Sequence, residues 1–241
     1  MGDRLPSADT VRALLRQRHP DAAAAFWAGS LSRGEGTPTS DIDLVIVFPE
    51  LDHAWRETVE AEGRLVEMFF HDPASLDVFF AKDVDRGHPT LMAMVADGID
   101  LIPGPLATTV RARARAVLDA GPRPWNAAEL EGSRYGAGDL LDDLSGATDR
   151  AEIQAIGVWL YGHVFEHHRR ARGRWSASGK QIVRMLRQEE GAFGRRFLAA
   201  FDALFERAEK AGVVDLVDEI YAPDGGVLRH WRQDAPPHRG G

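Results

Sequence analysis

The sequence predicts an α/β (α+β) domain with a small mixed sheet, followed by an all-α helical bundle. Two observations predict this order. In the first part, short apolar and β-branched runs alternate with helical patterns, and a Pro-Gly-Pro break at 103–105 closes the last run. After this break, strand patterns disappear and long helical patterns follow one another. We therefore expect a first domain over 1–106, a helical domain over 107–233 and a disordered tail over 234–241.

A helix opens the first domain. Its Ser/Asp-rich entry and the apolar residues Val11, Leu14 and Leu15 predict a helix that ends before Pro20. Apolar runs bounded by Gly and Pro then predict strands, and apolar residues three and four apart predict helices. In chain order, we expect a helix over 7–18, strands over 22–28 and 41–48, a polar segment of helical character over 53–62, a strand over 64–71, helices over 75–80 and 88–96, and a strand over 98–102.

The second half carries apolar residues at helical spacing throughout. Leu141 and Leu144 mark one such pattern, and Leu160 and Val164 mark the next. A Gly-Pro-Arg-Pro break at 121–124 separates a first, basic helix from those that follow. The expected helices run over 110–120, 128–145, 149–172, 180–188, 193–211 and 213–221.

Composition limits the class of protein. A chain of 241 residues with 44% apolar and 27% charged residues is typical of a globular protein with one large or two ordinary domains. No apolar run has the length of a membrane span and the N-terminus lacks the apolar core of a secretory signal, so we expect a cytoplasmic protein without a membrane partner. The absence of cysteine excludes disulfides, thiolate catalysis and Cys-ligated zinc. A net charge of −8 disfavours long nucleic acid as a partner.

Two aspartates begin the second expected strand. The side-chain period of two places Asp41 and Asp43 on one face, and Ile42, Leu44 and Ile46 on the other. Two neighbouring carboxylates repel each other unless a cation lies between them, and hard oxygen ligands of this kind suit Mg²⁺. A site for a metal ion and a triphosphate is therefore the first hypothesis.

The residues before the aspartates suit phosphate binding. Gly29 and Ser30 follow an apolar strand and open a turn, where backbone amides and a hydroxyl can approach phosphate oxygens, and Arg33 adds a cation. Each motif alone is typical of an ordinary loop, but the two together, in this order and at this spacing, are far more specific. The combination resembles the signature of the polymerase-beta-type nucleotidyltransferase superfamily. This resemblance implies that the Gly-Ser turn holds the phosphates of a nucleoside triphosphate, ATP by expectation, and that Asp41 and Asp43 hold two Mg²⁺ ions.

Glu67 is an acid inside an otherwise apolar strand. The superfamily carries a third catalytic carboxylate on the strand beside the Asp-x-Asp strand, and Glu67 matches that place. The family often has Asp there, so the resemblance leaves open whether Glu67 is a third metal ligand or the general base. The alternative is a half-exposed strand position without a role. If Glu67 is neither, Glu129, Glu131 and Asp139 are the next candidates for a base.

The helical half resembles that of the aminoglycoside and lincosamide nucleotidyltransferases. This resemblance covers only the general layout and short pieces at 139–144 and 174–180, whereas the resemblance at 22–103 is strong. It implies that a substrate hydroxyl binds between the domains and that a lysine of the helical half contacts the triphosphate. Lys180 is the candidate, because it follows a Ser-Gly loop and opens a helix whose amides favour anions. An ordinary surface lysine is the alternative.

The helical half contains two further clusters, one of aspartates and one of histidines, which we interpret as structural and not functional. Asp139, Asp142 and Asp143 could line an acidic wall, but a solvated helix face is the favoured interpretation. The cluster of histidines lacks the usual zinc-ligand pattern, and we interpret its members as surface and interhelix residues. These histidines are His163, His167 and His168.

The function expected from these motifs is transfer of a nucleoside monophosphate from Mg²⁺-NTP to a hydroxyl of a small molecule, for example one similar to an aminoglycoside or lincosamide antibiotic. One alternative is a regulatory enzyme that adenylylates a protein, as in toxin–antitoxin pairs. The other is a catalytically idle module that binds a nucleotide or ligand. The sequence does not indicate the acceptor, the base preference or the oligomeric state.

Overall fold

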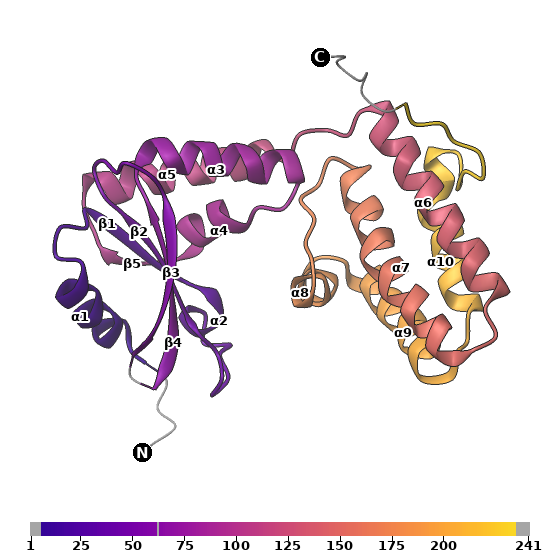
Figure 1. Cartoon of the computed structure of the whole chain (residues 1–241), viewed down its shortest axis with the longest axis horizontal. Helices are drawn as coiled ribbons and strands as arrows, with labels where there is room; N and C mark the ends of the chain where they lie inside the picture. Colours follow the sequence, from indigo (N-terminus) through magenta and orange to yellow (C-terminus); the bar gives the residue numbers. More distant parts are fainter. Residues whose placement is uncertain (1–5, 62, 235–241) are drawn as a thin grey trace, which may run out of the picture. The chain divides into compact units, whose positions relative to one another are not determined.

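The computed structural model of the chain describes residues 6–61 and 63–234. The chain divides into two compact units, one that ends at Pro122 and one that begins at Arg123. The first holds a mixed five-stranded sheet with helices, and the described part of the second is helical, which confirms the predicted fold class (Figure 1). Except for Asp234, the tail predicted to be disordered lies outside the described residues. No helix among the described residues is long and apolar enough to cross a membrane.

The sheet has the strand order β3-β4-β2-β1-β5. Strands β2 and β4 are parallel neighbours, and the other three pairs are antiparallel, so the sheet is mixed. This arrangement places the Asp-x-Asp strand in the centre, with the strand that carries Glu67 beside it. The strands are β1 (Ala24–Ala28), β2 (Ile42–Val47), β3 (Trp55–Ala61), β4 (Arg64–His71) and β5 (Ile99–Ile102).

One face of the sheet packs on helix α1 (Ala8–Arg18), whose N-cap Ser7 accepts a hydrogen bond from the Thr10 amide. The strand residues on this face are apolar and buried because they alternate with the acids, as the period of two predicts. The core on this side consists of Val11, Leu15, Ala22, Ala25, Trp27, Leu31, Ile42, Leu44, Ile46, Val66, Met68, Phe70 and Leu101.

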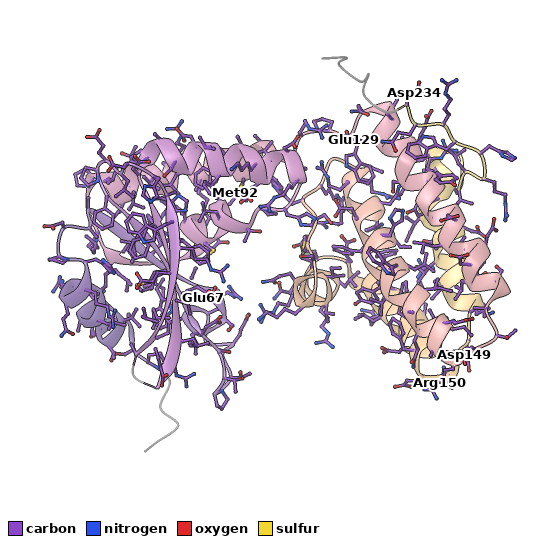
Figure 2. The ribbon with its side chains drawn as sticks, viewed as in Figure 1. Glu67, Met92, Glu129, Asp149, Arg150 and Asp234 are labelled. Carbon is purple, nitrogen blue, oxygen red and sulfur yellow. The ribbon has the colours of Figure 1, made fainter. Side chains whose placement is uncertain are left out.

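Three further helices of the first unit come after β4 in the chain. Helices α3 (Pro73–Arg86) and α4 (Thr90–Asp97) precede β5, and α5 (Pro105–Ala120) follows it. Met92 of α4, labelled in Figure 2, is fully buried. The Arg111 guanidinium of α5 lies 5.1 Å from the centre of the Phe26 ring of β1, on the face opposite the α1 core. It also donates to the carbonyl oxygens of Ala96, at 2.9 Å, and Gly98, at 2.8 Å.

These contacts determine where the first unit ends. Helix α5 packs on α3, α4 and β1, and it buries Ala107, Val110 and Ala114. The boundary expected between residues 106 and 107 falls inside this helix. The first compact unit therefore extends to Pro122, because α5 completes the cover of the sheet.

The expectation of helical character over 53–62 is wrong, because this segment contains strand β3, Trp55–Ala61. Its polar side chains suited a helix, but β3 is an edge strand whose outer residues face solvent. It pairs with β4 in antiparallel register from Trp55 opposite Phe70 to Ala61 opposite Arg64. The Trp55 and Phe70 rings stack with centroids 4.4 Å apart, which anchors the strand.

The second unit is a bundle of α6 (Ala127–Gly146), α7 (Arg150–Arg170), α8 (Lys180–Gln188), α9 (Gly191–Arg207) and α10 (Ala211–Tyr221). Its core contains Leu160, Phe165, Phe197 and Phe201. Helix α9 ends four residues earlier than expected, because Ala208 adopts a left-handed conformation with φ of 56° and stops it.

Two of the three histidines are buried interhelix residues, which agrees with the interhelix part of the interpretation. His167 is fully buried, with Nδ1 3.0 Å from the Ser133 hydroxyl and Nε2 3.0 Å from an Asp224 carboxylate oxygen. His168 lies 3.2 Å from Glu190. These contacts join α7 to α6, to the 3-10 turn Ala222–Asp224 and to the start of α9, as interhelix residues do.

Candidate functional site

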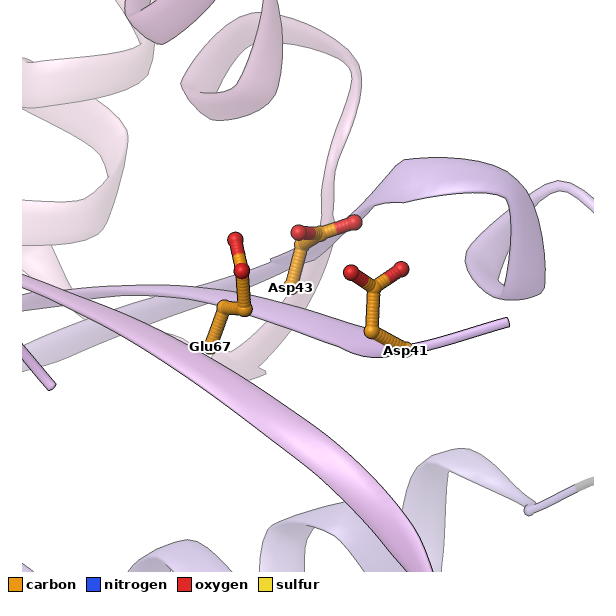
Figure 3. A group of neighbouring side chains, drawn as sticks. All are labelled: Asp41, Asp43 and Glu67. Carbon is orange, nitrogen blue, oxygen red and sulfur yellow. The ribbon is translucent and has the colours of Figure 1, made fainter. Parts of the chain in front are cut away.

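Strands β2 and β4 bring three carboxylates together. Asp43 pairs with Glu67 in the parallel register, and Asp41 lies two residues before Asp43 on the same face. One carboxylate oxygen of each residue lies within 4.8 Å of the others, and all three side chains point to the same side (Figure 3). All three residues are half-buried. Among the described residues, this is the group of acidic and histidine side chains whose spacing suits a metal ion.

Gly29 lies directly beside the carboxylate of Asp43, at a position where the geometry requires glycine. It follows β1, whose last residue Ala28 pairs with Asp43, and its φ is +81°, a conformation that favours glycine. A Cβ at this position would overlap the Asp43 carboxylate, with the carboxyl carbon only 3.0 Å away. Only glycine therefore fits beside Asp43. The turn itself is a one-turn helix, α2 (Gly29–Ser32).

The loop that leads to Asp41 is held by polar contacts. The Ser30 hydroxyl donates to the Ser40 hydroxyl at 3.3 Å, and the Thr37 amide donates to the Ser40 hydroxyl at 2.8 Å. Arg64 of β4 donates to the carbonyl oxygens of Pro38, at 2.8 Å, and Ser40, at 3.1 Å. These bonds connect the phosphate-turn candidate Ser30 and the start of β2 through the same loop.

Arg33 lies at the C-cap of α2 and forms a 3.1 Å ion pair with Glu35. Both side chains are about two-fifths exposed, with relative exposures of 41% and 42%. A pair this exposed is weak, so Glu35 leaves Arg33 accessible to a phosphate. The role of Arg33 stays a prediction.

Arg56 is a residue of the site that was not expected from the sequence. Its Nη2 donates to Glu67 Oε1 at 3.1 Å from the neighbouring strand β3. Because segment 53–62 was expected to be helical, no strand was expected beside the one that carries Glu67, and the contact with Arg56 could not be anticipated. The alternation of Arg56 and Thr58 in a β-branched context is the signal that could have placed this cation beside the acid.

Residues 8–76 match the family model of the nucleotidyltransferase domain. The matched segment contains Gly29, Asp41, Asp43 and Glu67 and lies within the first unit. The similarity to this family model is therefore confined to part of the first unit, the part that holds the acidic group. Among solved structures, the chain resembles a nucleotidyltransferase-like protein from Exiguobacterium sibiricum 255-15, with 10% identity and a TM-score of 0.40 over 87% of this chain and 73% of that one. No curated protein matches the sequence.

The donor set of the acidic group fits Mg²⁺. Three carboxylates offer hard oxygen ligands, and Mg²⁺ prefers carboxylate and phosphate oxygens. Like charges at this spacing repel one another, and a divalent cation relieves that repulsion. The overlap that excludes a Cβ at Gly29 also shows that the local backbone accommodates the Asp43 carboxylate in this position. The residues would thus hold one or two divalent ions.

The remaining site candidates belong to the second unit. Lys180 is exposed at the first position of α8, where Gly179 supplies no side-chain cap. Asp139, Asp142 and Asp143 are exposed on α6, and Asp142 pairs with Arg229.

Glu129, a fallback candidate for the base, lies at the start of α6 (Figure 2). It accepts a hydrogen bond from Arg123 at 2.9 Å and one from the Asn126 amide at 2.8 Å. These bonds lower the pKa of Glu129 to about 2, and such a weak base is poorly suited to accept a proton.

Proposed function

We propose that this protein transfers a nucleoside monophosphate from Mg²⁺-NTP to a hydroxyl of a small molecule similar to an aminoglycoside or a lincosamide. The observation that carries the proposal is the convergence of Asp41, Asp43 and Glu67 beside the Gly29 turn, inside a segment that matches the nucleotidyltransferase domain. ATP is the proposed nucleotide. Two Mg²⁺ ions would neutralise the leaving pyrophosphate and increase the acidity of the acceptor hydroxyl.

The chain's own residues would bind and orient the reactants. Asp41 and Asp43 would hold the cations, because their oxygens lie on one face at the start of β2. Gly29 would let the backbone approach the phosphates, since it carries no side chain above Asp43. Ser30 would donate its hydroxyl to a phosphate oxygen in place of Ser40, and Arg33 and Lys180 would contribute positive charge.

Glu67 has two roles consistent with its position. As a third ligand, it would complete the carboxylate set opposite Asp43. As a general base, it would accept the proton of the acceptor hydroxyl, which requires the acceptor to lie within hydrogen-bond reach of its carboxylate. The variant Glu67→Gln separates the two roles, as described in the Discussion.

A small acceptor is proposed on two grounds. The net charge of −8 disfavours long nucleic acid and suits a cationic small molecule, which an acidic site would attract. The chain also carries a helical unit after the nucleotidyltransferase domain, in the order found in the antibiotic-modifying branch that the sequence resembles.

The test is incubation of the protein with Mg²⁺, each NTP in turn and a panel of aminoglycosides and lincosamides, with mass detection of products. The proposal predicts an acceptor whose mass increases by that of one nucleoside monophosphate, and no product in the presence of EDTA. Labelling of protein with no labelled small molecule would instead support the adenylylating alternative. Tight nucleotide binding without any product over the whole panel would support the idle module.

A further inference from the structure

Arg56 lies beside the acidic group without belonging to it. It projects from β3, the edge strand that pairs with β4, and its Nη2 donates to Glu67 Oε1 at 3.1 Å. Thr58, two residues on, is the register partner of Glu67, so Arg56 and Glu67 share one face of the sheet. The guanidinium also lies 5.5 Å from the centre of the Phe69 ring, on that same face.

The strand that carries Arg56 does not depend on this ion pair. Backbone pairing with β4 extends from Trp55 to Ala61, and the Trp55 ring stacks on Phe70. The Arg56 side chain is 59% exposed, and exposed ion pairs contribute little to stability. Arg56 therefore contributes little to the stability of β3, and its main electrostatic effect is on the Glu67 carboxylate.

The contact occupies part of the acceptor capacity of Glu67. Oε1 accepts the guanidinium hydrogen bond, so a cation at Oε1 would compete with Arg56, whereas Oε2 does not take part in that bond. The positive charge also opposes the approach of a second positive charge to the same carboxylate. Both effects weaken the binding of a divalent ion, while the hydrogen bond limits the rotation of the Glu67 side chain.

We propose that Arg56 is a positioning residue that acts as an internal counter-ion: it holds Glu67 as a one-oxygen ligand and keeps the affinity of the acidic group for free divalent cations low. The inference rests on the proposed function, because it assumes that the acids bind a metal. Its consequence is that the cation binds mainly together with the triphosphate, whose negative charge offsets that of Arg56.

The test measures Mn²⁺ binding to the full chain by electron paramagnetic resonance, without nucleotide and without turnover. Arg56→Gln should bind Mn²⁺ roughly three- to tenfold more tightly than the wild type. The repulsion between an exposed guanidinium and a cation is weak, but it is twice as large for a divalent as for a monovalent cation. Arg56→Lys keeps the charge and should stay within about twofold of the wild type. Arg196→Gln is the control, since it removes an arginine of similar exposure that pairs with a glutamate in the second unit, and it should leave Mn²⁺ affinity unchanged.

A double-mutant cycle with Glu67→Gln tests the route of the effect. If Arg56 acts through Glu67, then Arg56→Gln should have less effect on Mn²⁺ affinity in the Glu67→Gln background than in the wild type. Unchanged or weaker Mn²⁺ binding by Arg56→Gln, in a wild type that binds Mn²⁺, would overturn this inference and leave the proposed function intact. A wild type that binds no Mn²⁺ with or without nucleotide would overturn both.

Discussion

The substitution Gly29→Ala tests the contact between the phosphate turn and the acidic group. Gly29 has φ of +81°, and an added Cβ would overlap the Asp43 carboxylate. Alanine in this left-handed conformation costs roughly 1–2 kcal/mol of unfolding free energy. Asp43 must also move, because its carboxyl carbon lies 3.0 Å from the new Cβ position.

The structure provides a matched control for the backbone cost. Gly34 has φ of +74°, but nothing lies within 4 Å of a Cβ built there. Gly34→Ala should therefore show the same loss of roughly 1–2 kcal/mol without displacing a carboxylate. The difference between the two variants isolates the displacement of Asp43.

Catalysis should separate the two variants far more than stability does. A shift of about 1 Å at a reacting group costs on the order of a hundredfold in rate. We expect kcat/KM for nucleotidyl transfer to fall by about that factor in Gly29→Ala and by less than about threefold in Gly34→Ala, with similar melting temperatures for both. Equal kcat/KM values for the two variants would refute the reasoning.

Three further predictions concern ionisable groups. Asp41→Asn or Asp43→Asn should abolish transfer while the melting temperature stays unchanged or rises, since the substitution relieves repulsion between acids. Glu67→Gln should slow the chemical step by roughly a hundredfold or more if Glu67 is the base, with little change in Mg²⁺-NTP affinity. If Glu67 is a ligand, higher Mg²⁺ should restore part of the rate. Burial lowers the pKa of His71 and His167 to about 4. As the pH falls from about 6.5 to about 4, each of these histidines should therefore lower the free energy of unfolding by up to roughly 3 kcal/mol.

The controls follow from the same contacts. Asp52→Asn removes an exposed aspartate outside the acidic group and should keep full activity. Full activity in Asp41→Asn or Asp43→Asn would instead remove those residues from the site. For the pH prediction, the sign is fixed by the unfolded chain, whose histidines take up protons first as the pH falls. Urea titrations with equal unfolding free energies at pH 7 and pH 4.5 would contradict it.

The central part of the site could be predicted because it depends on local periodicity. Alternation along β2 fixes the shared face of Asp41 and Asp43, and the isolated acid in an apolar strand identifies Glu67. The match of residues 8–76 to the family model of the nucleotidyltransferase domain covers the segment that holds these three acids. A turn at Gly29 that lets the backbone approach phosphates was also expected, whereas the overlap of a Cβ with Asp43 is visible only in the folded chain.

The remaining features depend on tertiary pairing. Strand β3 forms through backbone bonds to β4, and its polar composition outweighed the weak alternation in its own sequence, so Arg56 was missed. Helix α5 looks like the first helix of the bundle, but it packs on α4 and β1, and its Arg111 lies over the Phe26 ring of β1. The burial of His167 likewise requires Ser133 and Asp224, which are distant in sequence.

The most direct test of the central claim follows the phosphorus atoms of the nucleotide. Parallel reactions contain Mg²⁺, an acceptor from the panel and ATP labelled with ³²P at either the α or the γ position. Nucleotidyl transfer predicts that the α label appears in the acceptor and that the γ label leaves as pyrophosphate. Transfer of the γ label to the acceptor would contradict the account, because it would show phosphoryl rather than nucleotidyl transfer.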